Sequence, residues 1–228
     1  MDKNNTLFKD KEEFRTNKDG YYKWYKRLAD LLKSCEKMED YKKIFWNEDM
    51  VKGTKTHPNH TQCSFDLEND IKKIDEPRMC RCMYYYDEKN PKCMKCPLEK
   101  KYKNISKYKI IEHEIPMHHQ YKKCGGIDLV ITDENNVNYY VEMKDKDSKE
   151  TIIRMVSEIY TYTLDDEERF KHKAIGFFAG SKQFNEYITE HNSDNPDFDY
   201  ILKDITVFIF YEKSIDESGV VTYEIEKE

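Results

Sequence analysis

Long apolar runs are missing from this sequence. No segment approaches the roughly 20 consecutive apolar residues that a membrane-spanning helix requires, and the polar segment 1–13 lacks the apolar centre of a signal peptide. We therefore expect an intracellular, cytoplasmic protein without a membrane partner. With 7 Gly and 6 Pro among 228 residues, the chain also lacks the composition of collagen-like or low-complexity proteins.

An excess of basic residues is also absent. The formal net charge of −6 argues against a polycation that coats nucleic acid, although a local basic groove is compatible with it. Aromatic residues, in contrast, make up 14% of the chain. Because aromatic side chains bury large areas, they predict a folded core despite a charged content of 37%.

The apolar pattern divides the chain into three segments. Residues 1–52 carry a helical apolar stripe and are expected to pack on the core as a helical segment. In residues 53–106 the periodicity fades while Cys, His and Pro accumulate, which predicts an irregular inserted module. Residues 107–228 show regular strand and helix patterns and are expected to form the main core.

The core segment alternates between these two patterns. Strands are predicted over 108–116, 126–132, 137–144, 174–179, 205–211 and 220–225, and helices over 151–164 and 181–189. The second and third strands are joined by the turn 133–136 and are expected to form a hairpin. This order predicts an α/β protein with a mixed central sheet flanked by helices.

Two acidic residues and a lysine are expected to meet in the predicted hairpin. Strand alternation places Glu142 and Lys144 on one face of their strand, and Asp128 is expected beside Glu142 across the hairpin. Paired carboxylates with open positions suit a hard divalent cation such as Mg²⁺. Asp128 is flanked by Ile127 and Leu129, where an idle carboxylate would be costly to bury.

This pattern resembles the PD-(D/E)xK nuclease superfamily, which has the restriction-endonuclease-like fold. Ile127-Asp128 matches its PD element with Ile in place of Pro, and Glu142-Met143-Lys144 matches its (D/E)xK element. Residues 125–128 are also similar to the GxxD form of the RecB-like branch. The resemblance covers about residues 107–211 and implies a nuclease core with a restriction-endonuclease-like mixed sheet.

The helix that follows the hairpin carries a second motif of the RecB-like branch. Glu158 and Tyr162 stand as in its Gln-x-x-x-Tyr motif, with a charged Glu in place of the neutral Gln. The resemblance implies that Asp128 and Glu142 hold Mg²⁺ or Mn²⁺ and that Lys144 supports the water nucleophile. It gives Glu158 or Tyr162 the role of orienting the site.

Members of the superfamily often add a further acid upstream of this pair. Glu68, in a short helix predicted over 66–74, is the preferred candidate for this position. Glu114 and Glu112, which share one face of the strand 108–116, compete for the same role. The alternative for these two residues is that they are solvated charges on the strand surface.

Four cysteines give a second signal. Cys80 and Cys82 form a C-x-C pair and Cys93 and Cys96 a C-x₂-C pair, with ten residues between the pairs. In a reducing compartment such spacing indicates metal rather than disulfide, and four thiolates complete a structural Zn²⁺ site. Zinc is favoured over an iron–sulfur cluster. The cysteines of cluster-bearing RecB-like nucleases bracket the nuclease core at both ends, whereas these four cysteines all lie on one side of it.

A lysine-rich stretch follows the first cysteine pair. Tyr102 and Tyr108 interleave with the lysines, so the stretch can form a phosphate-tracking surface with stacking aromatics. The alternative is a solvated linker. The lysines are Lys89, Lys92, Lys95, Lys100, Lys101, Lys103, Lys107 and Lys109.

These features favour a metal-dependent nuclease that hydrolyses phosphodiester bonds in nucleic acid, in DNA rather than RNA, with a zinc module that positions the substrate. The alternative is a non-catalytic, zinc-stabilised module on a nuclease-like scaffold that binds nucleic acid or protein. The acidic net charge and the Glu at position 158 motivate that alternative. A third option is a toxin or defence protein whose nuclease acts only when a partner activates it.

Overall fold

A computed structural model describes residues 21–45, 76–90, 93, 96, 98–116 and 126–228. Its helices are α2 (Tyr21–Lys33), α3 (Met38–Phe45), α4 (Glu76–Tyr85), α6 (Ile152–Thr163), α7 (Glu167–Lys171), α8 (Lys182–Asn192) and α9 (Pro196–Leu202). Its strands are β1 (Lys101–Asn104), β2 (Lys109–Pro116), β3 (Gly126–Thr132), β4 (Asn138–Lys144), β5 (Lys173–Phe178), β6 (Thr206–Ile215) and β7 (Val220–Lys227).

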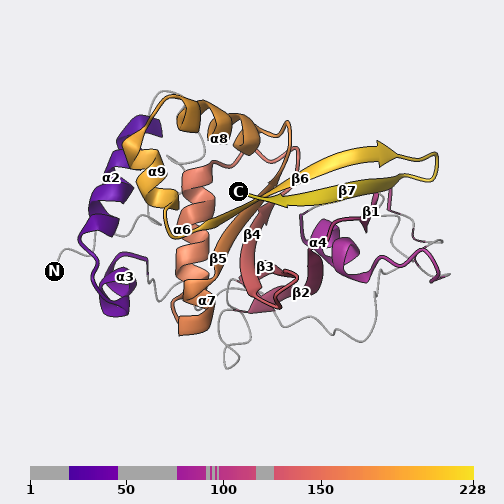
Figure 1. Cartoon of the computed structure of the whole chain (residues 1–228), viewed down its shortest axis with the longest axis horizontal. Helices are drawn as coiled ribbons and strands as arrows, with labels where there is room; N and C mark the ends of the chain where they lie inside the picture. The colour runs from indigo at the N-terminus through magenta and orange to yellow at the C-terminus, as the bar shows by residue number, and fades with distance from the viewer. Residues whose placement is uncertain (1–20, 46–75, 91–92, 94–95, 97, 117–125) are drawn as a thin grey trace.

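These strands form one mixed sheet in the order β1-β7-β6-β5-β4-β3-β2. The pairs β2–β3, β3–β4 and β6–β7 are antiparallel, whereas β4–β5, β5–β6 and β1–β7 are parallel. The parallel strands β4, β5 and β6 are joined through helices, as parallel pairs require. Figure 1 shows β6 and β7 extending to one side as a long hairpin, with β1 near its end. The expected α/β class and the mixed sheet are confirmed.

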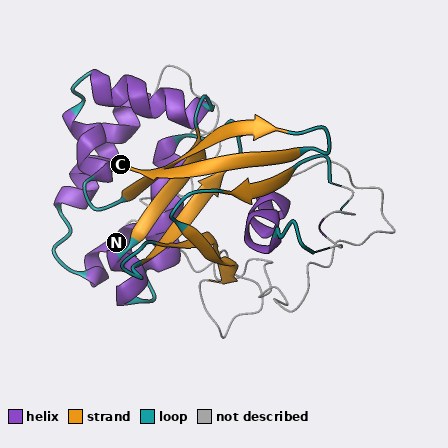
Figure 2. Cartoon of the chain, turned by 45° about the vertical axis from the view of Figure 1, so that its right-hand side comes forward, coloured by secondary structure: helices purple, strands orange, loops and turns teal. Residues whose placement is uncertain are grey.

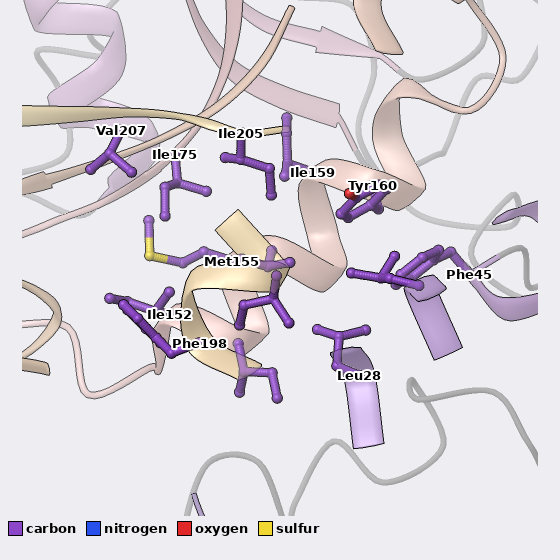
Figure 3. Packing of buried hydrophobic residues seen from close by; sticks show 14 of the residues in the cluster. Leu28, Phe45, Ile152, Met155, Ile159, Tyr160, Ile175, Phe198, Ile205 and Val207 are labelled. Atoms are coloured by element: carbon purple, nitrogen blue, oxygen red, sulfur yellow. The ribbon is translucent and has the colours of Figure 1, made fainter. Parts of the chain in front are cut away.

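The first core lies between the sheet and most of the helices. It is centred on α6, whose apolar side chains pack on strand residues such as Ile175 and Val207. Figure 3 shows that Leu28, Phe45 and Phe198, from α2, α3 and α9, close the other side of α6. Because α6 is covered by the sheet on one side and by helices on the other, it is held firmly behind β4.

The second core lies on the opposite face of the sheet, under α4. Val130 belongs to the first core while Leu129 and Ile131 belong to the second, as strand alternation requires. Met79 and Met83 of α4 pack in this second core. Figure 2 shows α4 apart from the other helices, which gather on the other side of the strands.

Helix α4 and strand β1 differ from the irregular module that we expected over residues 53–106. The described part of that segment contains one helix that packs in a core and one strand that pairs with β7. The apolar residues of α4 do recur at helical spacing, but Cys and Pro obscured the pattern. The sheet therefore begins before residue 107.

The other expected elements match within a few residues. All six predicted strands are present, and the helices predicted over 151–164 and 181–189 are α6 and α8. The short helices α7 and α9 were not predicted, and the helix predicted over 66–74 lies outside the described residues. Among the helices that are described, none has the length and apolar character needed to cross a membrane.

Candidate active site

The site begins where β3 and β4 separate. Their ladder of paired residues ends at the pair Leu129 and Val141. Asp128 comes directly before Leu129 in β3. Its Oδ2 accepts a hydrogen bond from the backbone N–H of Met143 at 2.9 Å. The carboxylate thus takes the place of a strand partner for β4, and this contact holds Asp128 beside Glu142.

Three carboxyl groups converge at this point. Glu76, Asp128 and Glu142 each offer an oxygen, and these oxygens lie within 4.8 Å of one another. In the part of the chain that the structure describes, this is the only such group of three or more His, Cys, Asp or Glu residues. Asp128 and Glu142 are 4% and 3% exposed. The structure therefore brings together the two acids expected from the hairpin and adds Glu76 from α4.

Lys144 lies against these carboxyl groups. Because Val141 and Met143 pack in the second core, strand alternation turns Glu142 and Lys144 towards α6. The Lys144 side chain is 6% exposed. Its Nζ lies near four carboxyl oxygens: Oε1 of Glu142 at 2.6 Å, Oε1 of Glu76 at 3.2 Å, Oε2 of Glu150 at 3.3 Å and Oε2 of Glu158 at 3.6 Å.

Helix α6 supplies Glu158 together with a compensating cation. Arg154, one turn earlier on α6, forms an ion pair with Glu158. Burial alone would raise the pKa of Glu158, but the charges of Lys144 and Arg154 outweigh it and hold that pKa below its ordinary value. The negative charge of Glu158 is therefore matched by two cations.

Tyr162, one turn further along α6, enters the site as a neutral phenol. Burial, followed by the negative charges of Glu158 and Glu142, raises the pKa of Tyr162 well above its ordinary value. A phenol that keeps its proton can donate a hydrogen bond. Tyr162 therefore adds no charge to the site.

The site carries more acidic than basic groups. Its five carboxyl groups belong to Glu76, Asp128, Glu142, Glu150 and Glu158, and its two cations to Lys144 and Arg154. Burial and then the charge of Asp128 raise the pKa of Glu76 to about 8 and that of Glu142 well above its ordinary value. Burial opposes the charged form of Lys144, but the Glu142 and Glu158 carboxylates outweigh it and raise its pKa. The excess acids must therefore hold protons or bind a further cation.

The donor set fits a divalent cation. Glu76, Asp128 and Glu142 each offer a carboxyl oxygen, and these oxygens lie within 4.8 Å of one another. Carboxylate oxygens are preferred ligands of Mg²⁺ and Mn²⁺. These three residues can therefore hold such a cation.

The structure leaves the prediction for the further upstream acid untested. Glu68 lies outside the described residues. Among the described residues, the acid that joins Asp128 and Glu142 is Glu76, the first residue of α4. Sequence reasoning missed Glu76, although the following Pro77 is a signal for a helix start.

Glu114 lies outside the three-carboxyl group. Its carboxyl group contacts Arg81 of α4 at 3.1 Å and lies 3.5 Å from Nδ1 of His113. Burial opposes ionisation, but hydrogen bonds from His113 and Arg81 lower the pKa of Glu114 to about 2. Its backbone φ is +48°. In the structure this residue links β2 to α4.

The four cysteines predicted as zinc ligands do not converge in the structure. No cysteine belongs to a described group of three or more ligand residues. Cys80 and Cys82 are buried in the second core, and Cys93 Sγ lies 3.5 Å from the backbone carbonyl oxygen of Tyr85. Residues two apart on a helix point in different directions, so α4 does not direct both Cys80 and Cys82 to one metal. The zinc site stays a prediction.

The lysine-rich stretch does not present its tyrosines on the surface. Tyr102 and Tyr108 are buried in the second core, and Tyr102 belongs to β1, which has joined the sheet. Lys101 is also buried and donates to backbone carbonyl groups, while Lys103 pairs with an acidic side chain. The expected stacking surface is therefore wrong for these two aromatic residues.

Comparisons of this chain with protein-family models, with curated proteins and with solved structures give no match. The α/β architecture therefore rests on the strand order itself. Any function must be argued from the side chains that meet at the end of the hairpin.

Proposed function

We propose that the protein is a metal-dependent nuclease of the PD-(D/E)xK type, with a restriction-endonuclease-like core. The observation that carries the proposal is the convergence of Glu76, Asp128 and Glu142 beside Lys144. The order of a hairpin, the helix α6 and the parallel strand β5 supports it, because this is the context in which the motif acts in that superfamily. The proposed substrate is nucleic acid, DNA before RNA.

Glu76, Asp128 and Glu142 would hold Mg²⁺ or Mn²⁺. Such a cation, when bound, polarises a phosphoryl oxygen and lowers the pKa of a bound water. Lys144 remains protonated among its carboxylates, so its ammonium donates hydrogen bonds to the attacking water and places positive charge beside the phosphate. Asp128 keeps its orientation through the N–H of Met143.

Helix α6 supports this arrangement from behind. Glu158 binds Lys144 through one oxygen and Arg154 through the other, so the helix restrains the lysine. Tyr162 adds a neutral hydroxyl donor to the same helix face. Because α6 is packed between the sheet and three other helices, these side chains start from a rigid element, which favours a preorganised site.

The test is a cleavage assay on the full chain. Labelled single-stranded DNA, double-stranded DNA and RNA are incubated with Mg²⁺, Mn²⁺ or EDTA. We expect cleavage only with a divalent cation, and a loss of about a hundredfold or more in Glu142→Ala and in Lys144→Ala. Asp147→Asn, which removes an exposed charge from the loop after β4, is the matched control and should retain activity. Cleavage that survives both site substitutions would refute the proposal.

A second candidate is a non-catalytic module that binds nucleic acid or protein. The observation that favours it is the low exposure of the site, with Asp128, Glu142 and Lys144 each almost fully buried. In this alternative the cysteines bind Zn²⁺ and the carboxyl groups bind no divalent cation. Elemental analysis of the purified protein, combined with Mn²⁺ titration, separates the two functions, because only the nuclease requires Mn²⁺ binding that depends on Glu142.

A further inference from the structure

The contacts of Lys144 fall into two sets. Glu76 and Glu142 belong to the three-carboxyl group, whereas Glu150 and Glu158 do not. A divalent cation held by the first set would draw on the same oxygens that Lys144 contacts. It would also repel the ammonium, since both are positive. The Lys144 ammonium then depends on Glu150 and Glu158 for the negative charge that balances it.

The loop that carries Glu150 places its carboxyl group near the Lys144 ammonium. It lies between β4 and α6, and its side chain is 19% exposed. Gln183 of α8, which is fully buried, donates from Nε2 to the backbone oxygen of Glu150 at 2.8 Å and to that of Ser148 at 3.3 Å. These two hydrogen bonds from the Gln183 side chain restrain the backbone of the loop between β4 and α6. The Glu150 carboxyl group therefore reaches Lys144 from a restrained backbone.

Glu158 alone neutralises Lys144 only in part. Its carboxyl group is shared with Arg154, and its Oε2 lies 3.6 Å from Lys144 Nζ. Glu150 Oε2 lies nearer, at 3.3 Å. Of the two acids outside the three-carboxyl group, Glu150 is thus the closer to the ammonium.

We propose that Glu150 is a positioning residue that balances the Lys144 ammonium when a divalent cation occupies the carboxyl oxygens of Glu76 and Glu142. This inference rests on the proposed function, because it requires a cation at Glu76, Asp128 and Glu142. Lys144 already donates hydrogen bonds to Glu142 and Glu76. Without the Glu150 charge, it would depend more on these two carboxyl groups and compete more strongly with the cation for them. Glu150 therefore sets the metal affinity through Lys144 and not by direct contact.

The test is a double-mutant cycle on the Mn²⁺ affinity of the full chain, measured by electron paramagnetic resonance and calorimetry. We expect Glu150→Gln to bind Mn²⁺ about tenfold more weakly than the wild type, a coupling typical of contacting charges. Lys144→Met should bind more tightly than the wild type, because the competing ammonium is gone. In the Lys144→Met background, Glu150→Gln should change the affinity by less than about twofold.

Two controls separate a positioning role from a structural one. Asp147→Asn removes the same charge from the same loop at an exposed position, and it should leave the Mn²⁺ affinity within about twofold of the wild type. Glu150→Asp keeps the charge and should restore most of the affinity that Glu150→Gln loses. Circular dichroism confirms that each variant is folded before its affinity is compared.

The outcomes distinguish this inference from the function on which it rests. An equal loss of affinity from Glu150→Gln in both backgrounds would overturn the role of Glu150, because the effect would not pass through Lys144. Unchanged affinity in Glu150→Gln would overturn it as well. In either case, loss of Mn²⁺ binding in Glu142→Ala would leave the proposed metal site standing, whereas undiminished binding in Glu142→Ala would refute that site itself.

Discussion

Replacement of Glu76 by Gln should stabilise the metal-free protein. Burial and then the charge of Asp128 raise the pKa of Glu76 from 4.5 to about 8. Since the pKa in the folded state lies above the unfolded value, the folded protein retains a proton that the unfolded chain releases. The free energy of unfolding therefore falls as the pH rises from about 4.5 to about 8. A glutamine carries no such proton and avoids this loss.

The size of the effect follows from the same pKa values. At pH 7 the solution pH lies above the unfolded pKa of 4.5 and below the folded pKa of about 8. At about 1.4 kcal/mol for each pKa unit, the interval from 4.5 to pH 7 corresponds to a loss of about 3 kcal/mol in the free energy of unfolding. The Glu76 side chain is 25% exposed, and solvent screening reduces the effect to about 2 kcal/mol. We therefore expect Glu76→Gln to be more stable than the wild type by about 2 kcal/mol at pH 7 and equally stable near pH 4.

The assay is urea unfolding with EDTA at several pH values, followed by the same titration with Mn²⁺. A cation at a hundred times its Kd adds about 2.7 kcal/mol to a protein that binds it. The wild type should gain this stability and Glu76→Gln should gain much less, so the order of stability reverses. Glu217→Gln, an exposed position, is the matched control. A metal-free Glu76→Gln that is less stable than the wild type at pH 7, or a difference that does not vary with pH, would refute the reasoning.

Two further substitutions test the packing of the rest of the fold. Burial, offset in part by a hydrogen bond from Tyr25, raises the pKa of Glu186 to about 7. The wild type should therefore lose stability between about pH 4.5 and 7, and Glu186→Gln should make the fall in melting temperature over that range shallower. Gly219 has a φ of +78°, and a Cβ there would lie 2.2 Å from the backbone oxygen of Glu99. We expect Gly219→Ala to lower the free energy of unfolding by about 1–3 kcal/mol in urea titrations, and an unchanged midpoint would contradict the geometry.

The hairpin was predictable because its signals are local. Alternation fixed which residues of β3 and β4 share a face, and the turn between them is held by its own side chain. Asp133 accepts hydrogen bonds from the N–H groups of Asn135 and Val137 at 2.9 and 3.0 Å. The neighbourhood of Asp128 and Glu142 could therefore be derived from spacing alone.

The rest of the site depends on contacts between distant segments. Glu76 reaches Asp128 only because α4 packs on the sheet, and Glu150 reaches Lys144 through a loop that α8 restrains. No periodicity in the sequence reports such packing. Cys80 shows the same limit, since spacing alone does not distinguish a metal ligand from a small apolar residue in a core.

Strand β1 was missed for a similar reason. It is four residues long and pairs with β7, which lies more than one hundred residues later in the sequence. The lysines of this stretch suggested a solvated surface, but Lys101 is buried through hydrogen bonds to backbone carbonyl groups. A charged residue can thus be buried when its partners come from another part of the chain.

The most direct test of the central claim is anomalous diffraction from crystals soaked in Mn²⁺, recorded at the manganese absorption edge. The metal site proposed here predicts a peak in contact with carboxyl oxygens of Glu76, Asp128 and Glu142, and loss of that peak in Glu142→Ala. A map with no peak at these three residues at saturating Mn²⁺, or a peak that persists in Glu142→Ala, would contradict it.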